Sequence, residues 1–122
     1  MNELLKFLAL SSDDLETAQF LCDGKRYRSS ISRAYYAMYY ATQALLLSQN
    51  LDTSTHRGVI KLLGLHFVKT GKITPNVARL LSDAYDLRQA SDYDSDLSEN
   101  EMTAQSAIEN AKKFICEVKI IL

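Results

Sequence analysis

The stretch YRSSISRAYYAMYYATQALLLSQ, residues 27–49, decides the fold of this chain. Its apolar and small side chains recur every three or four residues, which is the period of an α-helix. The main stripe is formed by Ile31, Ala34, Tyr35, Met38, Thr42 and Leu45. Tyr36, Tyr40 and Leu47 lie almost opposite that stripe, so apolar and aromatic side chains surround much of the helix. Such a helix is usually central or packs against two partners, and one of those partners could be a second copy of the chain.

The segments around this stretch predict further helices at about residues 3–23, 55–70, 75–91 and 98–122. Thr74 followed by Pro75 predicts a cap and a first helical position, and Ser98 with Glu101 predicts a capping box for the last helix. The chain has one proline, four glycines and no alternating strand pattern. We therefore predict an all-α fold with one domain, residues 1–122, which forms an up-and-down helical bundle of four long helices plus a shorter connecting helix.

The composition excludes several classes of protein. At 122 residues and 47% hydrophobic composition, the chain can bury a core without disulfides or metal ions. Cys22 and Cys116 have neither a C-x-x-C nor a Cys/His metal spacing, so we expect buried or half-buried thiols and no metal or cofactor. The start, MNELLKFLAL, is too short an apolar run for a signal peptide, and no segment approaches the ~20 apolar residues of a membrane span. We expect a cytoplasmic protein with no membrane partner.

Charge is distributed unevenly along the chain. Residues 25–79 hold nine Lys or Arg and one acid, whereas the flanking regions are acidic and the net charge is −1. This segregation predicts a basic surface for a polyanion or an acidic protein, unless these bases pair with acids of the same fold. Four of the bases surround the start of the second helix, beside Tyr27 and Tyr36, and could hold a phosphate backbone while a tyrosine stacks on a base. They are Lys25, Arg26, Arg28 and Arg33.

Arg88 lies in the middle of an apolar helix face. With 100° per residue, it shares the stripe of Val77, Leu80, Leu81, Ala84 and Tyr85. A guanidinium cannot lose its proton and is costly to bury without a partner, so it must meet an acid or a phosphate, or reach a wet cleft. Two structural arrangements would satisfy the guanidinium equally well. Arg88 could form an ion pair with Asp92, one turn later, or its alkyl chain could extend at the helix end so that the charge reaches solvent.

Three stretches together resemble the HEPN domain: YRSSISRAYYAMYYATQALLLSQNL (27–51), THRGVIKLLGLHFVKTGKI (55–73) and LRQASDYD (87–94). The resemblance implies a helical bundle that commonly forms a homodimer. It also implies kinship with metal-independent ribonucleases and toxins, many of which are encoded beside a small nucleotidyltransferase that acts as antitoxin. The active motif of the family is R-x4-6-H, near the start of a late helix. Arg88 matches its arginine, whereas Tyr93 occupies the position of its histidine.

The tyrosine at the position of the motif histidine determines which function the sequence predicts. Metal-free RNA cleavage needs groups that give and take protons near neutrality, and tyrosine, with a pKa near 10, is a poor base. We expect a HEPN-like protein that binds nucleotide or RNA phosphate through Arg88, with Asp92 and the basic cluster nearby, and pairs with a nucleotidyltransferase-type partner. One alternative is a metal-independent ribonuclease toxin in which Tyr93 or another histidine supplies the base. A second is a non-catalytic interaction module whose arginine pairs with Asp92.

The two histidines differ in their predicted positions. His66 shares the apolar face of the third predicted helix with Val59, Leu62 and Leu63, which favours a core histidine. His56 begins that helix beside Arg57, where it could cap the helix or form a hydrogen bond. His56 is therefore a weak candidate for a site that faces the basic segment.

Overall fold

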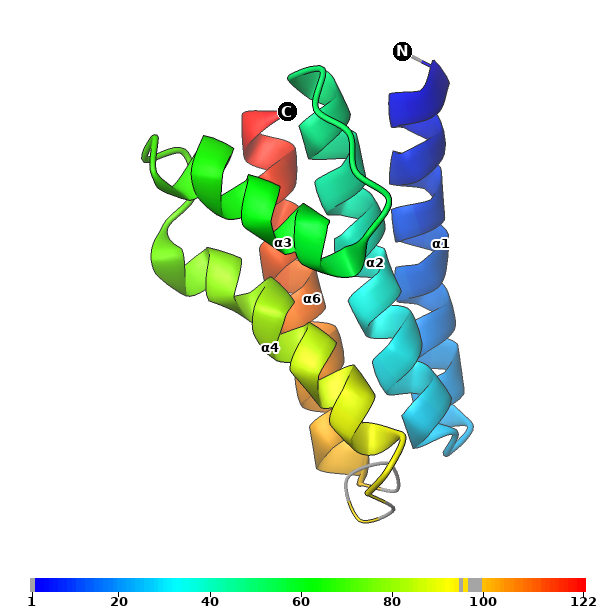
Figure 1. Ribbon diagram of the computed structural model, residues 1–122. Coiled ribbons are helices and arrows are strands. Elements are labelled where there is room, and N and C mark those ends of the chain that lie inside the picture. Colours follow the sequence, from blue (N-terminus) through cyan, green and yellow to red (C-terminus); the bar gives the residue numbers. More distant parts are fainter. Residues whose placement is uncertain (1, 95, 97–99) are drawn as a thin grey trace.

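The fold is a bundle of helices, seen here in a computed structural model that describes residues 2–94, 96 and 100–122. The elements are α1 (Asn2–Asp23), α2 (Tyr27–Ser48), α3 (His56–Leu63), the π-helical turn η1 (Gly64–Val68), α4 (Pro75–Ser91) and α6 (Glu101–Ile121). Figure 1 shows α1, α2, α4 and α6 running alternately down and up, with the shorter α3 crossing α2. The described residues contain no strand. The predicted all-α bundle is thus confirmed, and no helix of the described residues is long and apolar enough to cross a membrane.

Side-chain caps fix where α4 and α6 begin. The hydroxyl of Thr74 accepts a hydrogen bond from the backbone N–H of Val77, with proline at the next position, as predicted. The last helix differs from its prediction, because its cap is Asn100, whose side chain accepts from the N–H of Thr103. Ser98, the predicted cap, lies outside the described residues. α6 therefore begins at Glu101, about half a turn later than the capping box implied.

The helix α2 is the centre of the bundle. All six residues of its predicted stripe are buried, and α1, α3, α4 and α6 all pack against it. Small side chains let α1 approach closely, since Ala18 and Ala37 are fully buried. Two buried hydroxyls bridge these helices: Ser11 Oγ donates to the Ala37 carbonyl at 2.6 Å, and Ser30 Oγ donates to the Ala18 carbonyl at 2.7 Å. Each such bond contributes about 1 kcal/mol, so α1 and α2 are joined by more than apolar contact.

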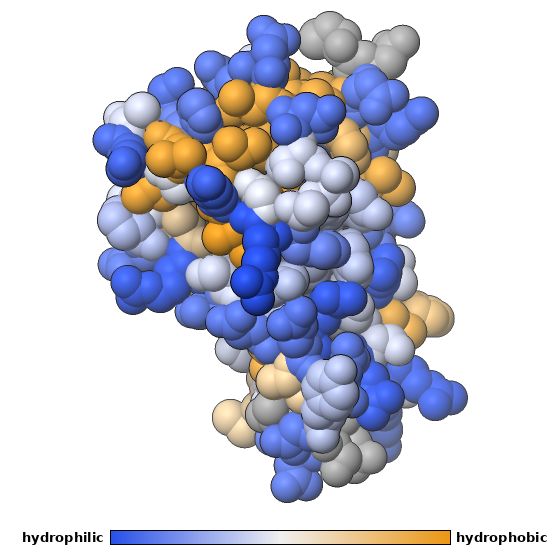
Figure 2. All heavy atoms as spheres, in the orientation of Figure 1, coloured by the Kyte–Doolittle hydropathy of each residue, from blue (hydrophilic) through white to orange (hydrophobic). Residues whose placement is uncertain are grey.

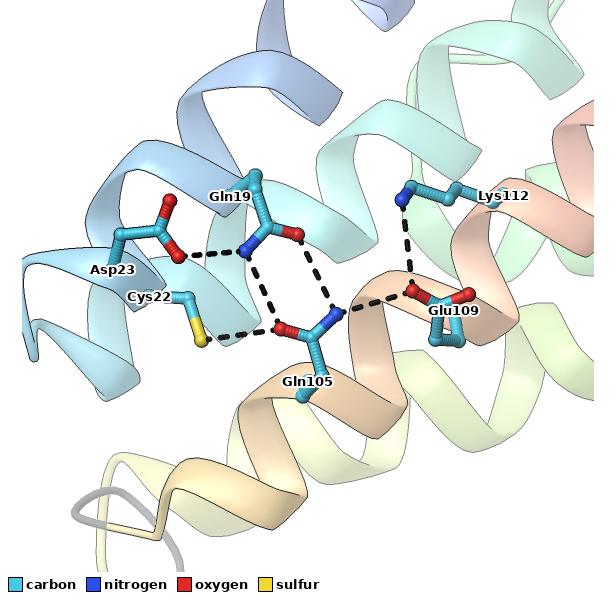
Figure 3. Close-up of polar contacts among 6 residues, drawn as sticks. All are labelled: Gln19, Cys22, Asp23, Gln105, Glu109 and Lys112. Carbon is cyan, nitrogen blue, oxygen red and sulfur yellow. Dashed lines mark hydrogen bonds and ion pairs between the residues drawn. The ribbon is translucent and has the colours of Figure 1, made fainter.

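A polar network joins α1 to α6 (Figure 3). The amides of Gln19 and Gln105 donate to each other across the helices, at 3.3 and 3.4 Å. The thiol of Cys22 lies 3.8 Å from the same Gln105 oxygen, and burial raises its pKa. Cys22 is thus the buried thiol that the sequence predicted. Cys116 is exposed instead, because Ile115 beside it takes the core position and the next residue of a helix points about 100° away.

The third predicted helix is not one regular α-helix, and the prediction that His66 lies in the core was wrong. α3 ends at Leu63 and the chain continues in η1, where the N–H of Lys69 reaches the carbonyl of Gly64 five residues back. A π-turn places one extra residue in the turn and so shifts every later side chain around the axis. Phe67, 1% exposed, therefore fills the core position expected for His66, which is exposed.

Candidate functional site

Arg88 faces the middle of α2 from the last turns of α4. Its side chain is half-buried, and its Cζ lies 5.2 Å from the ring centroid of Tyr36 and 5.8 Å from that of Tyr35. Within the described residues the ion pairs are Arg33 with Asp14 and Lys112 with Glu109, so Arg88 belongs to neither. Asp92 is exposed and does not pair with Arg88, contrary to one of the two structural alternatives. The guanidinium of Arg88 thus lies against aromatic rings, and no acid of the described residues forms an ion pair with it.

Four tyrosines and a histidine form a cluster between α2, the start of α3 and α4. These three helices pack against one another, and Figure 1 shows their ribbons. We call this group of rings the tyrosine–histidine cluster; its members are Tyr35, Tyr36, Tyr39, Tyr85 and His56. The ring of His56 is central, since its centroid lies 4.7 to 5.8 Å from those of all four tyrosines. Rings at such distances attract each other in offset and edge-on arrangements. The guanidinium of Arg88 therefore lies beside a stacked aromatic surface.

His56 lies in this cluster, although its position in the sequence made it only a weak candidate for the site. It is the first residue of α3, half-buried, and its Nδ1 lies 2.6 Å from the hydroxyl oxygen of Tyr35. Burial, and then the nearby charge of Arg88, lower the pKa of its imidazole below the usual 6.5. The imidazole is consequently neutral at pH 7. Sequence spacing carried one usable signal, the position of His56 directly after a cap threonine, but could not reveal which helices the ring would meet.

A tight turn holds His56 in place. The Thr55 hydroxyl caps α3 by accepting from the N–H of Gly58 at 2.9 Å. A methyl group on Gly58 would lie 2.6 Å from that oxygen and closer still to the Thr53 hydroxyl. Glycine is therefore required here by the close approach of the preceding loop.

Gly58→Ala is expected to lower the free energy of unfolding by about 1–2 kcal/mol, because the cap must move. Gly64→Ala is the matched control: a methyl group there meets nothing within 4 Å, and alanine should stabilise a helical position by about 0.5–1 kcal/mol. Urea unfolding of the two variants measures the difference. Equal changes in both would contradict the role assigned to the Thr55 turn.

The predicted basic cluster is divided in the structure. Arg33 donates to Asp14 at 3.0 Å, and its Cζ lies 4.7 Å from the Tyr36 ring centroid, so it joins the edge of the tyrosine–histidine cluster. Burial raises the pKa of Asp14, although Arg33 acts in the opposite direction. The other three bases, Lys25, Arg26 and Arg28, are exposed around the turn between α1 and α2 and belong to no ion pair of the described residues.

The remaining predicted site residue lies apart. Tyr93 follows the end of α4 and is 93% exposed, and the described ring contacts do not include it. The structure therefore does not bring Tyr93 to Arg88. No group of three or more His, Cys, Asp or Glu side chains that could hold a metal ion occurs among the described residues.

Known proteins match the chain over most of its length. The family model of the HEPN domain matches residues 5–121. A protein of Methanocaldococcus jannaschii named "Putative toxin MJ0605" is 37% identical over 96% of this chain and 87% of its own. The UPF0332 protein PH1297 of Pyrococcus horikoshii is 41% identical over 66% of this chain and 56% of its own. The crystal structure of TT1696 from Thermus thermophilus covers all of both chains with a TM-score of 0.81 at 19% identity, which shows a shared fold. The chain belongs to the HEPN domain family.

Proposed function

We propose that this protein is a toxin-type HEPN protein that binds the phosphate of RNA or of a nucleotide at Arg88. The observation that carries the proposal is a half-buried arginine that pairs with no described acid and whose guanidinium lies over the rings of Tyr35 and Tyr36. An arginine offers a planar fork of donors that suits two phosphate oxygens at once. The name of the relative MJ0605 supports the toxin class.

The tyrosine–histidine cluster supports nucleic acid over other anions. Aromatic faces beside a cation can stack a nucleobase while the arginine holds the adjoining phosphate. Lys25 and Arg26 in the α1–α2 turn and Arg28 at the start of α2 are exposed, and we propose that they contact further phosphates. In Figure 2 the face seen is mostly hydrophilic in its lower half, whereas apolar side chains gather in its upper half.

A homodimer and a nucleotidyltransferase-type partner belong to the same proposal, as does a cytoplasmic location. Their support is the family resemblance, because the apolar and aromatic residues around α2 are already covered by α1, α3, α4 and α6 of the same chain. The apolar side chains exposed outside α2, among them Phe20 and Ile120, are compatible with a protein partner. The gene next to this one tests the partner directly: it should encode a small nucleotidyltransferase that co-purifies with the chain.

A second candidate, a metal-independent ribonuclease, is favoured by one observation. His56 lies close enough to Arg88 for the arginine charge to affect its pKa, and a histidine beside an arginine could move a proton while charge develops on phosphate. The lowered pKa opposes this candidate, because little imidazolium is present at pH 7 to protonate a leaving oxygen.

A fluorescein-labelled RNA oligonucleotide incubated with the protein in EDTA should be bound and remain intact, because the site offers hydrogen-bond donors to phosphate while the lowered pKa of His56 leaves little imidazolium to protonate a leaving oxygen. Fluorescence anisotropy measures binding, and a denaturing gel measures length. Absence of any binding would overturn the proposal. Metal-independent cleavage that is lost in Arg88→Ala would establish the ribonuclease instead.

A further inference from the structure

One nitrogen of His56 has no hydrogen bond within the described residues and is not fully buried. Nδ1 forms a hydrogen bond with the Tyr35 hydroxyl, whereas Nε2 forms none within the described residues. Every buried side-chain nitrogen or oxygen of those residues has a hydrogen-bond partner. Nε2 is therefore reached by solvent, and it can meet a ligand.

The Tyr35 hydroxyl determines which nitrogen carries the proton. Tyr35 is 1% exposed, and in the described residues its hydroxyl bonds to His56 Nδ1 alone. Burial above all, and then the neighbouring tyrosines, raise the pKa of this hydroxyl, so it stays protonated. A buried O–H that fails to donate loses a hydrogen bond at a cost of about 1–3 kcal/mol, so Tyr35 donates to Nδ1. A neutral imidazole has one N–H, which is then on Nε2.

His56 and Arg88 flank the same two rings. The His56 centroid lies 5.5 Å from the Tyr35 ring and 5.8 Å from the Tyr36 ring, while Arg88 Cζ lies 5.8 and 5.2 Å from them. Neither side chain pairs with a described acid. We propose that His56 is the second anion contact of this site, and that its Nε2–H donates to an oxygen of the phosphate group held by Arg88. Tyr35 is the positioning residue, because it fixes the tautomer that makes Nε2 a donor.

This inference rests on the proposed function and adds a pH dependence to it. The titratable or charged groups that face His56 are Tyr35, Tyr36 and Tyr39 from α2 and Tyr85 and Arg88 from α4. Of these, Arg88 lowers the pKa of the free imidazole. A phosphate bound between the two offsets that charge and favours the imidazolium, which raises the pKa of His56. By linkage, a proton taken up on binding makes binding tighter as pH falls.

The experiment measures affinity from pH 8 to pH 5.5 with two probes, a fluorescein-labelled oligouridylate and ATP. Wild-type affinity should rise by about three- to tenfold as pH falls. His56→Phe keeps a ring in the cluster but removes the donor, so affinity at pH 7 should fall by about five- to tenfold. His56→Gln can still donate but cannot titrate, and should retain most of the affinity at pH 8 with a flat pH profile. His66→Phe, which replaces an exposed histidine beyond α3, should behave as wild type.

Tyr35→Phe tests the positioning role. Long-range proton–nitrogen spectra of the wild type should show the proton of neutral His56 on Nε2, and Tyr35→Phe should show a mixture of tautomers. The variant should lose about two- to threefold in affinity at pH 8. Near pH 5.5 it should recover, because an imidazolium carries a proton on both nitrogens.

The outcomes separate the two proposals. If Arg88→Ala binds both probes as wild type does, the proposed function fails. If Arg88→Ala loses binding while His56→Phe matches His66→Phe, only the role of His56 fails. A neutral His56 with its proton on Nδ1 would also overturn that role. Dependence on His56 with ATP identifies a free nucleotide as the ligand, and dependence with the oligouridylate alone identifies RNA.

Discussion

Replacing Arg88 by alanine is expected to lower affinity for RNA or nucleotide by about 10- to 100-fold, because a hydrogen bond to a charged group contributes about 1.5–3 kcal/mol. The fold should survive. Arg88 contributes contacts to the Tyr35 and Tyr36 rings, and each such cation–π contact stabilises by about 0.5–1 kcal/mol. Arg88→Lys should recover part of the affinity, since lysine keeps the charge but loses the planar fork.

The same helix provides the control for this result. Arg79 is exposed on α4, and Arg79→Ala removes an equal charge without touching the tyrosine–histidine cluster. Anisotropy titrations and thermal unfolding would be recorded for both variants and for Asp92→Ala. A purely structural module would show the opposite pattern: Arg88→Ala and Asp92→Ala would lose equal stability, and neither would respond to nucleotide.

Tyr35→Ala is expected to have the largest effect on stability, a loss of about 3–5 kcal/mol in the free energy of unfolding. Tyr35 is among the largest fully buried side chains, and its ring lies within 6.1 Å of Tyr36, Tyr39, His56 and Tyr85, centroid to centroid. Its loss would leave a cavity where α2, α3 and α4 converge. Domains of this kind are stable by about 5–15 kcal/mol, so the variant should be close to unfolding.

Urea unfolding measures this loss. Tyr35→Phe should cost only about 1 kcal/mol, the contribution of one hydrogen bond, which separates the ring from the hydroxyl. Tyr93→Ala removes an equally large but exposed side chain and should change stability by less than about 0.5 kcal/mol. A small effect of Tyr35→Ala would show that the cluster is not part of the core.

Much of the fold could be predicted because helical periodicity and caps are local signals. The stripe of α2, the proline start of α4 and the inward side of Arg88 all follow from spacing alone. The start of α6 was misplaced because several polar residues near Ser98 can cap a helix, and the backbone geometry selects Asn100. His66 was misplaced because a π-turn leaves no clear pattern in the sequence.

The site itself was only half predictable. Arg88 could be found from its own helix, but His56 comes from another helix and reaches the arginine only through packing on α2. Its partner Tyr35 was predicted as a core residue, and nothing in spacing distinguishes a ring that fills a core from one that also orients a histidine. Predicting that hydrogen bond requires the relative positions of α2 and α3, which spacing within one helix does not give.

At position 88, a half-buried arginine that pairs with no acid of the described residues costs stability at a place where function needs a cation. A leucine or methionine there could cover the Tyr36 ring without any cost of removing a charge from water. Selection for a durable fold alone would therefore replace this arginine, and natural proteins tolerate such positions where function requires them. In a search for heat-resistant variants of this protein, substitutions of Arg88 should therefore be found among the stabilised variants, and those variants should no longer bind RNA or nucleotide.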